Sequence, residues 1–193
     1  MDLTRKSIYV AVGHLTDPHS YMNYSSVVRR DSVRMAFLIS ALNDLDILAG
    51  DVQNEYLNAP TKEKLFFYAG DECKSYPGKF VIVFIALYGL NPSVFAWRNH
   101  LFDILGNHIG FQSSLADPDV WFKAATDKTG NEYYNSILVY VDDFLFVEKY
   151  LKSTWPSWIV STRHNPLVFG ILRSTLELML ENYCMVMVPV LGT

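Results

Sequence analysis

The spacing of apolar residues along the chain predicts two helices. In the first, from Ser32 to Asn43, apolar positions recur every three or four residues, and Asp31 or Ser32 is placed to cap its start. Its apolar face is expected to comprise Val33, Phe37, Ser40 and Ala41, widened by Met35, Leu38, Ile39 and Leu42. The second helix is expected to start at Asn91-Pro92-Ser93 and to end at Gly106 and Gly110, since proline suits a first turn and glycine a helix end.

Shorter runs rich in β-branched and aromatic residues predict strands. They are Leu45–Val52, Leu65–Ala69, Lys79–Leu87, Val120–Ala124, Tyr133–Tyr140 and Phe144–Val147. The run Lys79–Leu87 is dense in Val, Ile and Phe, as is typical of a buried strand. The last two runs flank a very short turn at Asp142-Asp143, which predicts an antiparallel hairpin. Helices mixed with antiparallel strands predict the α+β class.

Composition supports a folded domain but does not suggest a nucleic-acid enzyme. Of 193 residues, 50% are hydrophobic and 15% aromatic, enough to form a core. Charged residues make up only 19%, and the net charge is −4. This acidic balance argues against a bulk electrostatic attraction to nucleic acid.

Cysteine content and apolar run lengths indicate the expected cellular setting. Cys73 and Cys184 form no C-x-x-C motif, which argues against a zinc site or a disulfide framework and favours a reduced intracellular setting, cytoplasm or nucleus. The N-terminus does not look like a signal peptide. The longest uncharged apolar run, Phe80–Leu90, is shorter than the ~20 residues that a bilayer requires, so no membrane span is expected.

Two adjacent carboxylates, Asp142 and Asp143, interrupt the apolar segment Ile137–Val147. One interpretation is an exposed hairpin turn, where aspartate is common. The other is a divalent-cation site, because Mg²⁺ prefers carboxylate oxygens.

A metal site needs ligands from elsewhere in the chain. Asp51 ends a predicted strand, and it would face Asp142 if the two strands were neighbours in a sheet. Two Mg²⁺ ions could then be held between them, the arrangement used for phosphoryl transfer. Asp44 and Asp46 are alternatives, which we otherwise expect in a solvated turn.

Three ordered segments resemble the reverse transcriptase of Ty1/copia-type LTR retrotransposons. They are GDVQNEYLNAP (Gly50–Pro60), ALYGLNPSVFAW (Ala86–Trp97) and ILVYVDDFL (Ile137–Leu145). Weaker matches are YSSVVRRDSVRMAFLISAL (Tyr24–Leu42) and GFQSSLADPDVWF (Gly110–Phe122). The resemblance implies the palm and fingers of a right-hand polymerase, an antiparallel sheet packed on helices with the thumb missing.

The resemblance also implies an activity and its cofactor. It identifies the chain as an RNA-directed DNA polymerase domain in which Asp51 and Asp142 bind two Mg²⁺ ions and Asp143 completes the carboxylate cluster. The implied partners are an RNA or DNA template-primer and a deoxynucleoside triphosphate, with no membrane.

Further residues are assigned to nucleotide and primer by the resemblance. Tyr56 matches an aromatic gate under the sugar of the incoming nucleotide, although from the residues alone it is equally a half-buried strand tyrosine. Gly89 matches a small residue that lets the backbone approach the nucleotide, and Lys6 is the remaining cation near the triphosphate. Tyr140 and Val141 would support the primer end and the hairpin core.

Three departures from the family pattern weaken the expected activity. Glu55 replaces an alanine, Ile8 an arginine and Asn91 a lysine, so each change adds negative or removes positive charge where a triphosphate binds. We therefore expect a degenerate or weakly active polymerase. The alternatives are an inactive transposon remnant that acts at most as a binding or interaction domain, and an unrelated α+β domain whose aspartate pair is a turn.

The resemblance does not extend along the whole chain. It predicts a partial palm and fingers over residues 5–148 and a divergent C-terminal tail of unknown structure over residues 149–193. The tail has a turn-rich start and an oily end with poor periodicity, which suggests translation of a shifted frame or of flanking sequence.

Overall fold

The described residues form two compact units. The computed structural model describes residues 10–11, 25–52, 54–70, 77–150 and 187–189. One unit contains the described part of Asn54–His100 together with residues 10–11 and 187–189, and the other contains Ser25–Val52 and residues 101–150. The C-terminal tail expected over residues 149–193 falls almost entirely outside the described residues, as does Lys6.

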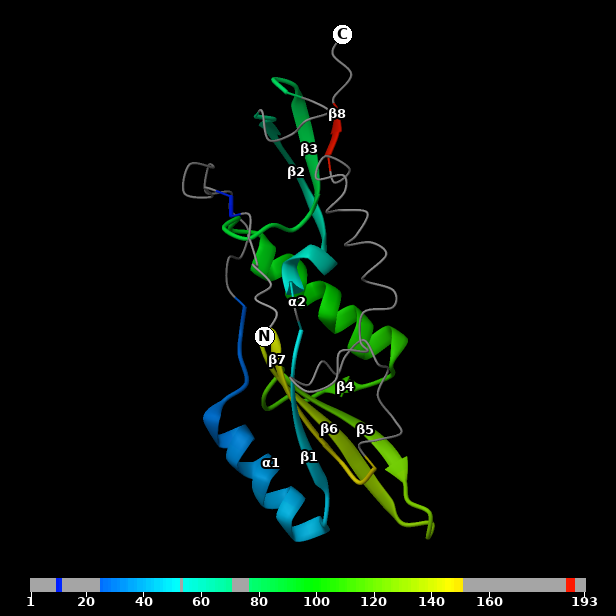
Figure 1. Ribbon diagram of the computed structural model, residues 1–193. Helices are drawn as coiled ribbons and strands as arrows, with labels where there is room; N and C mark the ends of the chain where they lie inside the picture. Colours follow the sequence, from blue (N-terminus) through cyan, green and yellow to red (C-terminus); the bar gives the residue numbers. More distant parts are fainter. Residues whose placement is uncertain (1–9, 12–24, 53, 71–76, 151–186, 190–193) are drawn as a thin grey trace, which may run out of the picture. The chain divides into compact units, whose positions relative to one another are not determined.

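The second unit is built on an antiparallel sheet (Figure 1). Its strand order is β1-β7-β6-β5-β4, and each neighbouring pair is antiparallel. The strands are β1 (Asp46–Asp51), β4 (Gln112–Ser113), β5 (Val120–Thr126), β6 (Glu132–Tyr140) and β7 (Asp143–Glu148). Antiparallel sheets combined with helices confirm the predicted α+β class.

Helix α1 (Arg30–Asn43) lies along one face of this sheet (Figure 1). The core between them is formed by Val28, Ala36, Val120, Leu138 and Val147, with Val33, Leu45, Ile47, Phe122 and Leu145 packed around it. Alternate strand residues point to this face, so Leu145 and Val147 of β7 both contribute to this core.

The predicted caps of α1 are wrong, because its start is held by a residue distant in sequence. The N-cap is Arg29, which makes no side-chain cap hydrogen bond. Instead, the carboxylate of Asp117 accepts hydrogen bonds from the backbone N–H of Arg29 (2.9 Å) and the hydroxyl of Ser32 (2.5 Å). Burial of Asp117 raises its pKa, but the hydrogen bonds from Ser32, Arg29 and Asp119 outweigh burial and leave the pKa below its ordinary value.

The buried face of α1 agrees with the prediction only in part, since Val33 packs against the core and Ser40 is buried as expected. Ala36 and Ser40 are buried, whereas most of the large apolar side chains of the helix are exposed. The exposed ones are Met35, Phe37, Leu38, Ile39 and Leu42. The sheet accepts small side chains beneath the helix, so most of the large apolar residues that predicted the helix lie outside its packed face.

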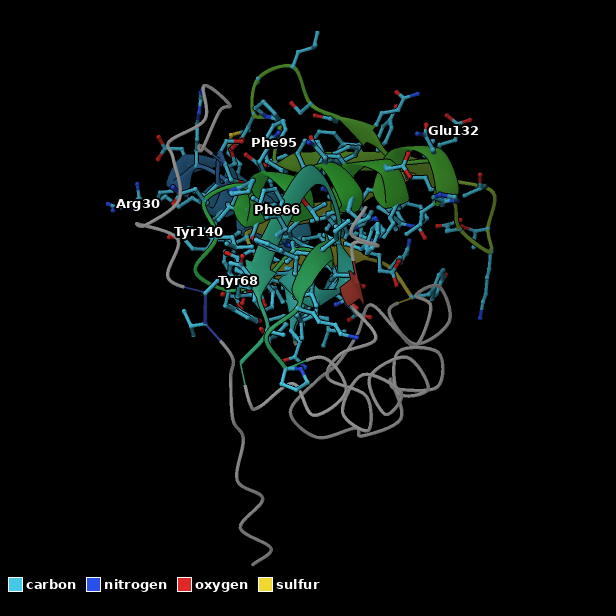
Figure 2. The ribbon with its side chains drawn as sticks, turned by 90° about the horizontal axis from the view of Figure 1, so that it is seen from above. Arg30, Phe66, Tyr68, Phe95, Glu132 and Tyr140 are labelled. Carbon is cyan, nitrogen blue, oxygen red and sulfur yellow. The ribbon has the colours of Figure 1, made fainter. Side chains whose placement is uncertain are left out.

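The first unit is built on the small antiparallel sheet β2-β3-β8. Its strands are β2 (Pro60–Tyr68), β3 (Phe80–Ile85) and β8 (Met187–Pro189), and a short 3₁₀ turn, η2 (Glu55–Asn58), precedes β2. Strand β3 is buried on one face only, because Val81 and Val83 are buried while Phe80 and Phe84 are exposed. The exposed rings of Phe66 and Tyr68 project from β2 (Figure 2) and contact Phe80.

Helix α2 (Ser93–Asp103) continues into η3 (Ile104–His108), one turn of wider π-type helix. The expected start of this helix is confirmed, but its α-helical part ends before Gly106. The ring of Phe102 meets Trp121 of β5 edge-on, with their centroids 4.7 Å apart, and Leu105 is fully buried. This end of the helix therefore contributes to the core of the second unit. Among the described residues, no helix is both long and apolar enough to cross a membrane.

The cap formed by Asp117 predicts a measurable loss of stability. Replacement of Asp117 by Ala removes the acceptor for the Arg29 amide and the Ser32 hydroxyl. We expect the free energy of unfolding to fall by about 1–3 kcal/mol, because a lost cap and lost charge-assisted hydrogen bonds each cost on this scale. Urea denaturation at neutral pH measures the loss.

Asp31→Ala is the matched control, since the side chain of Asp31 is 87% exposed and pairs with nearby Arg34. We expect it to cost about 0.5 kcal/mol or less. Because the folded pKa of Asp117 is lowered, its contribution is present above the pKa of an unfolded aspartate and is lost as the pH falls through the folded value. Equal losses for the two variants would contradict the capping role.

Candidate functional site

Strands β1 and β7 bring two distant carboxylates to the same place. They pair over their full length, from Asp46 opposite Glu148 to Asp51 opposite Asp143. Residues directly opposite in an antiparallel pair point to the same face, with Cβ atoms about 4.5–5.5 Å apart. Both aspartates are exposed at the end of the ladder. The strand adjacency that a shared metal site requires is therefore present.

The turn between β6 and β7 lies one residue earlier than the sequence suggested. Tyr140 pairs with Asp143, so the two-residue loop is Val141-Asp142, and Asp143 is the first residue of β7. Val141 has a φ of 59°. A β-branched residue at positive φ is strained, because its side chain crowds the backbone. The loop at the carboxylates is thus held in an unfavourable conformation by the strands on either side.

Asp142 is fastened to the end of β1. Its carbonyl oxygen accepts a hydrogen bond from the backbone N–H of Val52 at 2.9 Å, which continues the β1–β7 ladder past Asp51. Burial raises the pKa of the Asp142 carboxyl above its ordinary value, and the negative charges of Asp143 and Asp51 raise it further. Asp142 is therefore close enough to Asp143 and Asp51 to be repelled by both, and a bound cation would relieve that repulsion.

Tyr140 lies beside these carboxylates on the sheet. It is the register partner of Asp143, which in turn is opposite Asp51, so the three residues form a row across β6, β7 and β1. The Tyr140 side chain is 54% exposed, and Figure 2 labels it. The row presents one aromatic hydroxyl and two carboxylates to solvent.

The donor chemistry of this row fits a hard cation. Carboxylate oxygens are what Mg²⁺ prefers, and opposed aspartates with a third nearby are a suitable set. Within the described residues, no group of three or more His, Cys, Asp or Glu side chains is already arranged to hold a metal ion. The backbone thus brings the carboxylates together, and their side chains would have to converge further to share an ion.

A second group of predicted site residues lies in the first unit. Glu55 is buried in η2 and accepts a hydrogen bond from the hydroxyl of Tyr88 at 2.8 Å. The ring of Tyr88 meets that of Tyr56 edge-on, with centroids 4.9 Å apart. Tyr56 is thus partly buried against an aromatic neighbour.

Gly89 has a structural reason to be glycine. Its φ is 85°, and a Cβ at this position would overlap the carbonyl oxygen of Ala11 and crowd Val10. The segment is fixed there by the Ala11 N–H, which donates to the carbonyl of Tyr88 at 2.7 Å. Close approach of one backbone to another thus accounts for Gly89 without a bound nucleotide.

Comparison with known proteins identifies the family. The model of the family described as "Reverse transcriptase (RNA-dependent DNA polymerase)" matches residues 2–154. The chain belongs to the reverse transcriptase family. A similar protein is the retrovirus-related Pol polyprotein from transposon TNT 1-94 of Nicotiana tabacum, 26% identical over 128 residues. That alignment covers 65% of this chain and 9% of the polyprotein. No solved structure matches the chain significantly.

These matches confirm the predicted relationship to Ty1/copia-type retrotransposons. Sequence reasoning singled out Gly89 of the reverse transcriptase segment LYGL but missed Tyr88, whose hydroxyl holds Glu55. The signal was available, because a buried carboxylate requires a hydrogen-bond donor and a tyrosine hydroxyl is one. What the sequence could not supply was the proximity of two residues on different elements.

The strain at Val141 of this reverse transcriptase hairpin can be measured by paired substitutions. Val141→Ala removes the branched side chain but leaves a Cβ at a φ of 59°. Val141→Gly also removes the Cβ and with it the steric cost of left-handed backbone. We expect the Gly variant to be more stable than the Ala variant by about 1 kcal/mol, since left-handed backbone costs non-glycine residues about 1–2 kcal/mol. Thermal or urea unfolding of both variants measures the difference.

An alanine variant as stable as the glycine variant would show that the loop is unstrained. Gly78, which also has positive φ and has open space where a Cβ would lie, provides a reference for the same exchange. Gly78→Ala should lose a comparable amount of stability.

Proposed function

We propose that this chain is the catalytic core of an RNA-directed DNA polymerase, with residues 5–148 as a partial palm and fingers and residues 149–193 as a divergent tail. The proposed reaction is nucleotidyl transfer with two Mg²⁺ ions held by Asp51, Asp142 and Asp143. We further propose that the activity is weak. Membership of the reverse transcriptase family supports the reaction class.

The single observation that carries the proposal is the register of β1 and β7. It places Asp51 opposite Asp143 and ties Val52 to Asp142, although the two segments are far apart in the chain. If Asp142 and Asp143 only formed a solvated turn, the fold would not require a third aspartate, Asp51, at the end of the neighbouring strand. The arrangement favours a shared ligand over a solvated turn.

The residues of the chain have distinct proposed roles in this reaction. Bound Mg²⁺ would neutralise charge on the triphosphate and lower the pKa of the primer 3′-hydroxyl. Asp51 and Asp143 would hold the Mg²⁺ ions at the end of the paired strands, and Asp142 would add a third carboxylate from the strained turn. Tyr140, exposed in the same row, lies where it could support the primer end.

The nucleotide subsite is proposed from the family resemblance. Tyr56 is assigned to the sugar of the incoming deoxynucleotide, Gly89 to the backbone beside it and Lys6 to the triphosphate. Glu55, Ile8 and Asn91 make this subsite less positive than the family pattern, which is the reason for the weak activity. The partners would be an RNA or DNA template-primer and a deoxynucleoside triphosphate.

A second candidate function is that of an inactive remnant that acts at most as a binding or interaction domain. The same charge departures favour it, because Glu55 is a buried acidic residue directly before Tyr56 in the proposed nucleotide subsite. The two candidates differ in one property: only the polymerase core should bind a deoxynucleoside triphosphate in a Mg²⁺-dependent manner.

Primer extension tests the proposed polymerase directly. On a poly(rA) template with an oligo(dT) primer, dTTP and Mg²⁺, we expect slow extension by the wild-type chain that disappears in Asp142→Asn. Loss of one carboxylate should lower the rate by about a hundredfold or more, since it removes part of the electrostatic stabilisation of the transition state.

Asp46→Asn is the matched control, because Asp46 is an exposed aspartate at the opposite end of β1. It should leave the extension rate unchanged. No extension by the wild-type chain, together with no Mg²⁺-dependent binding of dTTP, would favour the inactive remnant. Extension that survives in Asp142→Asn would exclude the proposed carboxylate site.

A further inference from the structure

Glu55 is unusual because it is an acidic residue that the fold buries. It is 7% exposed and begins η2, directly before Tyr56. Burying a carboxylate is costly unless hydrogen bonds compensate it, so its partners should show why it is retained. By the resemblance described above, family members have alanine at this position. Any role of a carboxylate here is therefore particular to this chain.

The contacts of Glu55 connect it to Tyr56 through Tyr88. The Tyr88 hydroxyl donates to Oε2 of Glu55 at 2.8 Å. The ring of Tyr88 then packs against that of Tyr56, with an interplanar angle of 65° and centroids 4.9 Å apart. Such edge-to-face contacts are favourable and restrict ring orientation. The Tyr88 side chain thus links Glu55, which its hydroxyl contacts, to Tyr56, which its ring contacts.

The backbone on both sides of this triad is fixed. Tyr88 is bound to the segment at Val10 and Ala11 by a parallel bridge and by the Ala11 N–H. The η2 turn that carries Glu55 and Tyr56 starts from Asn54, which has a φ of 56°, and the Asn54 carbonyl accepts from the N–H of Leu57. The side chains therefore meet between two anchored segments.

We propose that Glu55 is a positioning residue that fixes the orientation of the Tyr56 ring through Tyr88. This inference rests on the proposed function for its consequence. If Tyr56 lies under the sugar of the incoming nucleotide, a fixed ring leaves less room for a 2′-hydroxyl than a mobile one. Glu55 thereby sets the preference for deoxynucleotides over ribonucleotides while adding a negative charge that weakens nucleotide binding overall.

Three substitutions separate the hydrogen bond from the packing. Tyr88→Phe removes only the hydroxyl and keeps the ring contact with Tyr56. Glu55→Gln keeps an acceptor oxygen for Tyr88 and removes the charge, and Glu55→Ala removes both. Tyr134→Phe is the control, because Tyr134 is 63% exposed on β6 in the other unit.

The first readout needs no activity. Fluorine NMR of the full chain with 3-fluorotyrosine at position 56 should give one restricted ring environment in the wild type, in Glu55→Gln and in Tyr134→Phe. Tyr88→Phe and Glu55→Ala should broaden or shift the signal, since they lose the hydrogen bond that orients Tyr88. An unchanged signal in both of the last two variants overturns the positioning role.

The second readout is the ratio of kcat/KM for dTTP to that for UTP in primer extension. We expect Tyr88→Phe and Glu55→Ala to lower this ratio by about tenfold, mainly through KM for UTP, because a site that admits the extra hydroxyl loses discrimination on this scale. Glu55→Gln should retain the ratio. Absence of extension by the wild type would count against the proposed function alone, because the NMR signals would still decide the role of Glu55. Active variants with an unchanged ratio would overturn the inference.

Discussion

The pairing register of β1 with β7 is the constraint on which the rest of the structure depends. Side chains alternate between the two faces of a strand. A slip of one residue in the pairing would therefore move every side chain of the slipped strand to the opposite face of the sheet. In the observed register Ile47 is opposite Val147 under α1, and Asp51 is opposite Asp143 at the open end of the same face. The packing of the core therefore fixes the meeting of the two aspartates.

Contacts at the two ends of α1, one long-range and one local, support this register from outside the strands. Asp117, from the loop before β5, holds the start of α1. At the other end of the helix, Asp44 takes up left-handed backbone and Leu45 donates to the carbonyl of Ser40 at 3.0 Å, which directs the chain into β1. Helix position, turn and strand register are consequently coupled.

The elements were predictable from sequence to the extent that local pattern determines them. Periodic apolar residues located α1, and runs rich in β-branched and aromatic residues located β1, β6 and β7, to within a few residues, because both patterns are local properties of the sequence. The packed face of α1 was predicted only in part, since Val33 and Ser40 lie on it as expected but Ala36 takes the place of the larger apolar residues. The cap by Asp117 could not be predicted, because its partners lie 85 and 88 residues away in sequence.

The residues of the candidate site were proposed from the family resemblance, and their pairing differs from the expected one, because Asp143 and not Asp142 lies opposite Asp51. Motif resemblance gave the family, and family membership is confirmed by the match over residues 2–154. The register that aligns Asp51 with Asp143, the turn at Val141-Asp142 and the burial of Glu55 against Tyr88 all depend on tertiary contacts. The family resemblance could mark Glu55 as a departure from the usual pattern, but it could not show that the Glu55 carboxylate accepts a hydrogen bond from Tyr88.

Mn²⁺ binding, measured by electron paramagnetic resonance as the loss of free-ion signal, tests the central claim most directly. If the β1–β7 register builds a shared cation site, Asp51→Asn and Asp143→Asn should each weaken Mn²⁺ binding by about tenfold or more, because each removes one of the negatively charged ligands that a hard cation prefers. Asp46→Asn, at the far end of the same strand, should bind as the wild type does. Equal Mn²⁺ binding by all of these variants and the wild type would contradict the claim that the paired aspartates form the metal site.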